Sequence, residues 1–255
     1  MFIRTEKNLK DFIRFYPIVS TLVIIHLALW FFINFLQLPI GLRFFQWGAG
    51  YNLGIHNGEY WRLVTPIFLH GDFMHALFNS FSLVLFGPAL EQMLGKFKFL
   101  VAYFAAGIIG NLATYLIEPT AFYSHIGASG AIFGLFGVYV YMVLFRKDLI
   151  DQANAQIVMV ISIIGLIMTF LRPGINIYAH IFGFIGGFAL ARILLSNVKP
   201  FSPWRNQSNR NDGNPVQFNS NRWNKRRVLP RGTGKTAIWI VLGILVLLGI
   251  MSRIL

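Results

Sequence analysis

Seven long apolar runs limit what this chain can fold into more than any other feature of its sequence. The runs cover residues 18–38, 74–94, 98–117, 129–145, 156–171, 177–195 and 236–252. A helix needs about 20 mostly apolar residues to cross the hydrocarbon core of a bilayer, and an open sheet cannot cross it because its edge groups stay unpaired. The runs also lack the alternation of barrel strands. The sequence therefore predicts an all-α polytopic membrane protein, with six transmembrane helices in a bundle and a seventh near the C terminus.

The basic residues are distributed unevenly between the runs. Most of the 22 Lys and Arg residues fall in the N-terminal segment, in the connections after the second and fourth runs, and in the segment after the sixth run. The positive-inside rule then places the N terminus in the cytoplasm and the C terminus outside. Four parts are predicted. They are a cytoplasmic segment (1–17), a six-helix core (18–195), a polar cytoplasmic linker (196–235) and a seventh transmembrane helix (236–255).

The linker 196–235 accounts for much of the formal net charge of +13. It carries nine basic residues and eight asparagines against a single acid, Asp212. This composition predicts a disordered, solvated tether, and contact with anionic lipid headgroups is the sharper alternative. Because the charge follows the membrane topology, we expect no nucleic-acid partner. The chain has no cysteine, so a thiolate metal site is excluded, and we expect no metal and no cofactor.

Strongly polar residues inside apolar runs are candidates for function, because each costs free energy in lipid unless it is paired or faces water. His26 stands alone in its run and is interpreted as a packed histidine. His75 and Asn79 are four residues apart and project from one face of a helix. Two such donors could hold one anion, although a hydrogen bond between helices would need the same spacing.

Ser129 begins the fourth run, where the first backbone N–H groups of a helix lack partners. A serine there commonly caps the helix. A cap would not need nearby glycines, however, whereas a nucleophile needs space for a substrate carbonyl, and glycines lie at 127 and 130. Both interpretations, cap and nucleophile, follow from the local sequence.

Small-residue pairs in the fourth and sixth runs predict that these two helices approach closely. The pairs are Gly130 with Gly134, and Gly183 with Gly187. His180 and Ser129 both lie within about a turn of the external ends of their runs, so helix contact would place a base beside a hydroxyl. Neither run contains an acid, which leaves a Ser–His dyad by elimination. The Ser129 backbone N–H, His75 and Asn79 are the donors available to an oxyanion.

Together these residues resemble the motifs of the rhomboid intramembrane serine proteases, over residues 15–195. The matching positions are Trp61-Arg62, the spaced set His70, His75 and Asn79, Gly127-Ala128-Ser129-Gly130, and Ala179-His180 followed by Gly183 and Gly187. The resemblance implies cleavage of transmembrane or membrane-proximal segments of other membrane proteins, in a bacterial cell membrane. The seventh run is similar to that of the six-plus-one members of the family.

The resemblance also implies a role for individual residues. Ser129 would be the nucleophile and His180 the base, with His75, Asn79 and the Ser129 amide forming the oxyanion hole. Phe133 would lie against the catalytic histidine, and the supporting positions are Gly127, Gly130 and His70. The alternative is a catalytically inactive rhomboid-like protein that binds membrane clients, but such relatives typically lose the serine or the histidine, and both are present here. The sequence does not predict the oligomeric state.

Overall fold

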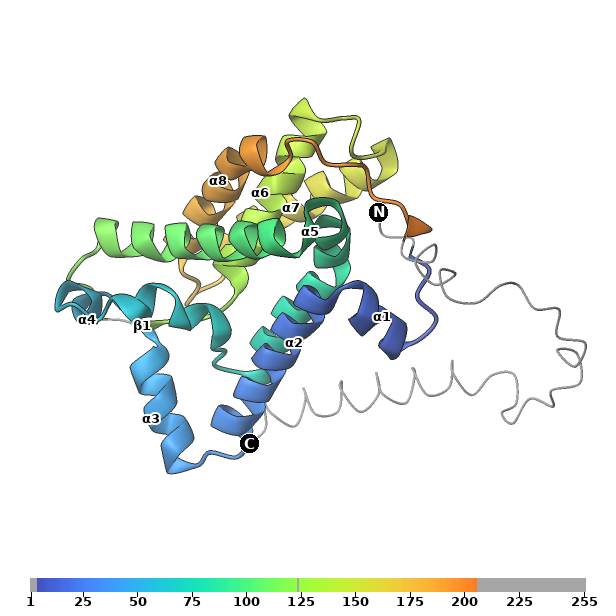
Figure 1. Cartoon of the computed structure of the whole chain (residues 1–255). Coiled ribbons are helices and arrows are strands. Elements are labelled where there is room, and N and C mark those ends of the chain that lie inside the picture. The colour runs from blue at the N-terminus through green and yellow to red at the C-terminus, as the bar shows by residue number, and fades with distance from the viewer. Residues whose placement is uncertain (1–3, 123, 206–255) are drawn as a thin grey trace, which may run out of the picture. The chain divides into compact units, whose positions relative to one another are not determined.

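The computed structural model describes residues 4–122 and 124–205, which are mostly helical (Figure 1). In chain order the elements are α1 (Leu9–Phe15), α2 (Pro17–Trp30), the π-helix η1 (Phe31–Phe35), α3 (Pro39–Gly48), β1 (Gly50–Tyr51), α4 (Asn52–His56), the 3₁₀ helices η2 (Tyr60–Leu63) and η3 (Thr65–Phe68), α5 (Phe73–Ile117), β2 (Ser124–His125), α6 (Ser129–Phe145), α7 (Gln152–Leu171) and α8 (Ile177–Leu194). The predicted seventh helix lies outside the described residues.

Four helical segments of the described part are long and apolar enough to cross a membrane. They are α2 with η1, α5, α7 and α8, and the apolar helix α6 is shorter, with 17 residues. These elements coincide with the first six apolar runs, because α5 covers both the second and the third. The described residues are therefore those of an all-α membrane protein apart from one short strand pair, while the count of six plus one transmembrane helices stays a prediction.

The second and third runs meet without a loop inside the 45-residue α5. Gly95 interrupts the helix there with φ 75° and ψ 166°, a left-handed conformation that glycine adopts without the strain a side chain would bring. Figure 1 shows the two halves of α5 running in different directions on either side of this point. The chain thus turns between the two runs at a single glycine.

Four of the described helices begin at residues whose side chains satisfy free backbone N–H groups, and α1 begins in this way at Asn8. Asp72 accepts a hydrogen bond from the backbone of His75 at the start of α5, and Asp151 does the same at the start of α7. Asn176 accepts one from the backbone of Ala179 at the start of α8. The cap of α8 thereby fixes the turn of the chain immediately before His180.

The core of the bundle lies between α5, α6 and α8, and small residues line the contact of α6 with α8. A methyl group at Gly183 would lie 3.0 Å from the carbonyl carbon of Gly130, and one at Gly187 would collide with the backbone of Gly134. The backbones of α6 and α8 thus touch at both glycine pairs, as the small-residue pairs predict.

The first residues after α8 lie against the bundle. The side chain of Gln92 in α5 pairs with the backbone of Ser202 through two hydrogen bonds of 3.0 and 2.9 Å. Thr5 donates a hydrogen bond of 2.8 Å to the carbonyl of Pro203. The predicted linker 196–235 therefore includes ten described residues, of which Val198, Phe201 and Ser202 contact the bundle, and its remaining residues lie outside the described part.

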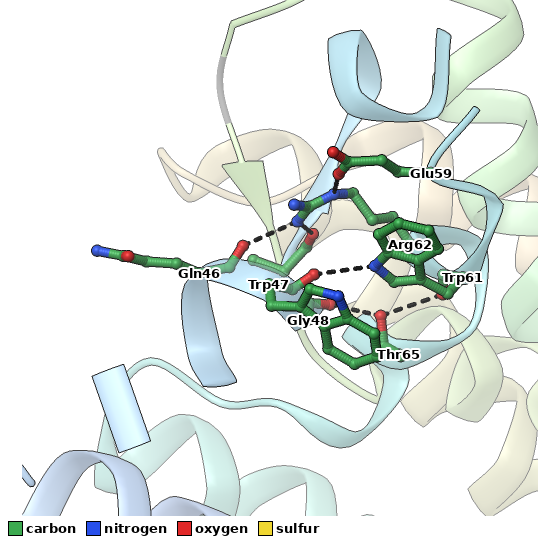
Figure 2. Close-up of polar contacts among 8 residues, drawn as sticks. Gln46, Trp47, Gly48, Glu59, Trp61, Arg62 and Thr65 are labelled. Atoms are coloured by element: carbon green, nitrogen blue, oxygen red, sulfur yellow. Dashed lines mark hydrogen bonds and ion pairs between the residues drawn. The ribbon is translucent and has the colours of Figure 1, made fainter. Parts of the chain in front are cut away.

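The segment between α2 and α5 contains several short helices held by one guanidinium group (Figure 2). Arg62 donates to the carbonyls of Gln46 and Ala49, at 2.8 and 2.6 Å, and pairs with the carboxylate of Glu59. The rings of Trp47 and Trp61 stack with their centroids 5.4 Å apart. These contacts join the end of α3 to η2.

This segment is also joined to the residues that precede Ser129. Gly50 pairs with His125 in the antiparallel ladder of β1 and β2. Two residues further on, the backbone N–H of Gly127 donates a hydrogen bond of 2.9 Å to the carbonyl of Pro66. The chain segment that leads into Ser129 is therefore held in place by residues outside α6.

Candidate active site

Ser129 is the first residue of α6, and its side chain does not cap the helix. Ala128 occupies the cap position, where no side-chain hydrogen bond is made. The Ser129 hydroxyl instead lies 2.7 Å from Nε2 of His180 in α8. This distance is that of a hydrogen bond in which the hydroxyl donates and the ring nitrogen accepts.

His180 is buried between neighbouring helices, with 7% of its surface exposed. The ring of Phe133, one turn after Ser129, stacks on the imidazole with centroids 4.3 Å apart and an angle of 20° between the planes. The second ring nitrogen, Nδ1, lies 2.8 Å from the hydroxyl oxygen of Thr169 in α7. The imidazole is thus held on one face and at both nitrogens.

His75 and Asn79 lie on the first half of α5 and face the turn before Ser129. A methyl group built on Gly127 would lie 2.5 Å from Nε2 of His75 and 3.7 Å from Nδ2 of Asn79. Gly127 has φ 122°, so only glycine fits both its backbone conformation and this close approach. Within the described residues, the buried Nδ2 of Asn79 has no hydrogen-bond partner. Two side chains that can donate therefore border the backbone next to Ser129.

A cavity of about 260 Å³ opens beside the Ser129 side chain. It is formed by α5, α6 and α7, and its lining residues are Asn79, Ser82, Ser129, Ile132, Phe133, Phe136, Ile161, Ile164 and Gly165. Most of these side chains are apolar, so the cavity suits an apolar group that presents a polar atom to Ser129 and Asn79.

His70 lies just before α5 and is 1% exposed. Its ring is 4.9 Å from that of His26 and 5.0 Å from that of His75, measured between centroids. Burial lowers the pKa of His70 to about 2, so this ring is neutral at ordinary pH. The structure therefore places His70 behind His75 and out of contact with Ser129, and it places His26 in the core, as its sequence context predicts.

Thr169 is the residue of this site that the sequence did not indicate. It lies in an apolar run and belongs to no motif, and a lone threonine in a helix commonly bonds to its own backbone. The only signal was a hydroxyl in the run next to the one that carries His180. Contact between the two helices is needed to turn that signal into a site residue.

The apolar helices make the chain an integral membrane protein. The family model described as the rhomboid domain matches residues 57–197, more than half of the chain. The chain belongs to the rhomboid family of intramembrane proteases.

Several curated proteins support this placement. The chain is 51% identical over 194 residues to a Bacillus subtilis protein named "Putative rhomboid protease YdcA", which covers 75% of this chain and 94% of that protein. It is 42% identical over 147 residues to the Rhomboid protease GluP of the same organism, covering 58% of this chain and 28% of that one. The Rhomboid-like protease 3 of Toxoplasma gondii is 33% identical over 160 residues, covering 62% and 60%.

Proposed function

We propose that this protein is an intramembrane serine endopeptidase that acts through a dyad of Ser129 and His180. The observation that carries the proposal is the 2.7 Å contact between the Ser129 hydroxyl and His180 Nε2. An imidazole at this distance can take the hydroxyl proton while the oxygen attacks a peptide carbonyl. The kinship with proteins named rhomboid proteases supports the same reaction.

The reaction proceeds in two halves. In the first, Ser129 Oγ bonds to the carbonyl carbon and His180 takes the proton. The peptide C–N bond then breaks, and His180 returns that proton to the leaving amine. In the second, water attacks the acyl ester, giving one proton to His180, and the Ser129 oxygen leaves and takes that proton back.

The negative charge on the tetrahedral intermediate is assigned to three donors. These are the Ser129 backbone N–H, the His75 ring and the Asn79 amide. The position of both side chains beside Gly127 supports this assignment. The Asn79 Nδ2 supports it too, because no described group accepts a hydrogen bond from this nitrogen. Preorganised donors of this kind lower the barrier because they need no rearrangement as the charge develops.

The proposed substrates are transmembrane or membrane-proximal segments of other membrane proteins. The apolar cavity beside Ser129 supports this class, since a membrane segment offers apolar side chains next to its scissile bond. The proposed site of action is a bacterial cell membrane, with the N terminus in the cytoplasm. The two Bacillus subtilis relatives support the first point, and the distribution of basic residues supports the second.

The proposal is tested with the full-length protein in lipid vesicles that also contain a transmembrane substrate labelled at both ends. Wild type should cleave it, and Ser129→Ala and His180→Ala should each fall to background, because the two members of a dyad act as a unit. A fluorophosphonate probe should label wild type and leave Ser129→Ala unlabelled. Binding of the substrate by wild type without cleavage or labelling would favour the inactive, client-binding alternative.

A further inference from the structure

The hydroxyl of Thr169 lies at the side of the His180 ring opposite to Ser129. Its oxygen is 2.8 Å from His180 Nδ1, while His180 Nε2 is 2.7 Å from the Ser129 hydroxyl. Thr169 is 1% exposed, so this contact is shielded from bulk water. Among the described residues, no carboxylate or carbonyl takes this position, which a buried carboxylate occupies in the Ser-His-Asp triad.

A second hydrogen bond of Thr169 favours one direction for its bond to His180. Thr169 Oγ1 also lies 2.9 Å from the carbonyl oxygen of Gly165, one turn earlier in α7, and a carbonyl can only accept. A hydroxyl has one proton, and here it is donated to Gly165. With its proton on the Gly165 carbonyl, the oxygen of Thr169 accepts, and this arrangement favours a proton on His180 Nδ1.

A neutral imidazole with its proton on Nδ1 has its lone pair on Nε2. The Nε2 lone pair is the one needed to take the proton of Ser129. The opposite tautomer would point an N–H at the serine oxygen and could not act as a base.

We infer that Thr169 is a positioning residue, which holds His180 in the tautomer and the orientation that leave Nε2 free to accept the Ser129 proton. The inference rests on the proposed function, since it gives that dyad a third, neutral member. It also places this member on α7, a different helix from those of Ser129 and His180. Three helices then meet at one imidazole.

The inference is tested by replacing Thr169 with valine, which has a similar shape and no hydroxyl. The carbonyl of Gly165 keeps its helical N–H partner in this variant, so the loss falls on His180 Nδ1. We expect kcat for a transmembrane substrate in vesicles to fall roughly 10- to 100-fold, with KM changed less than about twofold. Thr169→Ser restores the hydroxyl and should recover most of the lost kcat.

Ser162→Ala is the matched control. Ser162 lies two turns before Thr169 on the buried side of α7, is 2% exposed, and its hydroxyl has no partner among the described residues. Removing this hydroxyl should leave kcat at the wild-type value. Equal losses in Thr169→Val and Ser162→Ala, or in Thr169→Val and Thr169→Ser, would overturn the inference, because packing rather than the hydroxyl would then explain the loss.

A second measurement does not depend on activity. With ¹⁵N-labelled histidine, the ring nitrogens of His180 are assigned by comparison with His180→Asn, above the pH at which the ring protonates. Wild type should show a protonated Nδ1, and Thr169→Val should show a mixture of tautomers. A wild-type ring protonated on Nε2 overturns the inference. If instead Ser129→Ala cleaves as well as wild type, the proposed function fails, and the tautomer still reports on Thr169.

Discussion

Replacing Gly183 with alanine should slow the proposed proteolysis strongly without removing any functional group. Gly183 lies one turn after His180, and its partner Gly130 directly follows Ser129. An added methyl carbon would collide with the carbonyl oxygen of Gly130 and lie 3.0 Å from its carbonyl carbon, against the 3.5–4.0 Å at which carbon atoms pack comfortably. These atoms belong to the backbone of Gly130, so rotation of a side chain cannot relieve the contact. The two helices must then separate by about 0.5–1 Å.

This separation of α6 and α8 would lengthen the distance between Ser129 and His180. Added to the present 2.7 Å between Ser129 Oγ and His180 Nε2, it gives about 3.2–3.7 Å, at or beyond the limit of a hydrogen bond. A misplacement of this size can cost about 100-fold in rate. We therefore expect kcat to fall roughly 10- to 100-fold in a variant that still inserts and folds.

The assay is cleavage of a transmembrane substrate in vesicles, after thermal melts have shown that each variant is folded. Gly186→Ala is the control on the same helix, because an added methyl there would meet only the side chain of Ile109, which can move. It should keep most of its activity. A folded Gly183→Ala with wild-type kcat would refute the argument that backbone contact between α6 and α8 sets the distance within the dyad.

Three further predictions concern the oxyanion donors, the C-terminal region and pH. Asn79→Ala should lower kcat up to roughly 10²–10³-fold with little change in KM, and the reverse pattern would mark Asn79 as a binding element. Truncation after Arg205 should leave a folded core that cleaves in vesicles. Truncation after Ser196 should lower the melting temperature, because it removes the backbone of Ser202 that pairs with Gln92. Equal melting temperatures of the two truncated proteins would contradict this. Burial lowers the pKa of His125 from 6.5 to about 4. Between these two pH values the unfolded chain binds a proton that the folded chain does not. The free energy of unfolding should therefore be full above pH 6.5 and fall by up to about 3 kcal/mol as pH drops to 4. Unfolding followed from pH 7.5 to 4 should show this loss, and the part due to His125 should be absent from His125→Phe.

Hydropathy was enough to locate most of the helices. Spanning lipid requires a length and a composition that no other element shares, so α2 with η1, α7 and α8 begin and end close to their apolar runs. It was not enough at Gly95, since two runs separated by charged residues do not reveal that the chain turns at one glycine. The ladder of β1 and β2 was also beyond prediction, because strands of two residues leave no periodic pattern.

The candidate site divides in a similar way. Ser129 and His180 could be paired from sequence because small residues on both helices require close contact. The place of Thr169 could not be found in this manner. It depends on how α7 rotates against α8, and a helix that is apolar on nearly every side carries no sequence signal for the face it turns inward.

The sparse burial of α7 makes the bilayer itself a partner of the site. Only Val158, Ser162 and Thr169 are buried on this helix, and many of its other side chains are exposed and apolar. Its 20 residues rise about 30 Å, which equals the hydrocarbon thickness of a typical membrane. A thinner or thicker bilayer must therefore be met by tilting this helix before its better-packed neighbours. Thr169 lies near the C-terminal end of α7, so a change in the tilt of this helix would move its hydroxyl relative to Nδ1 of His180.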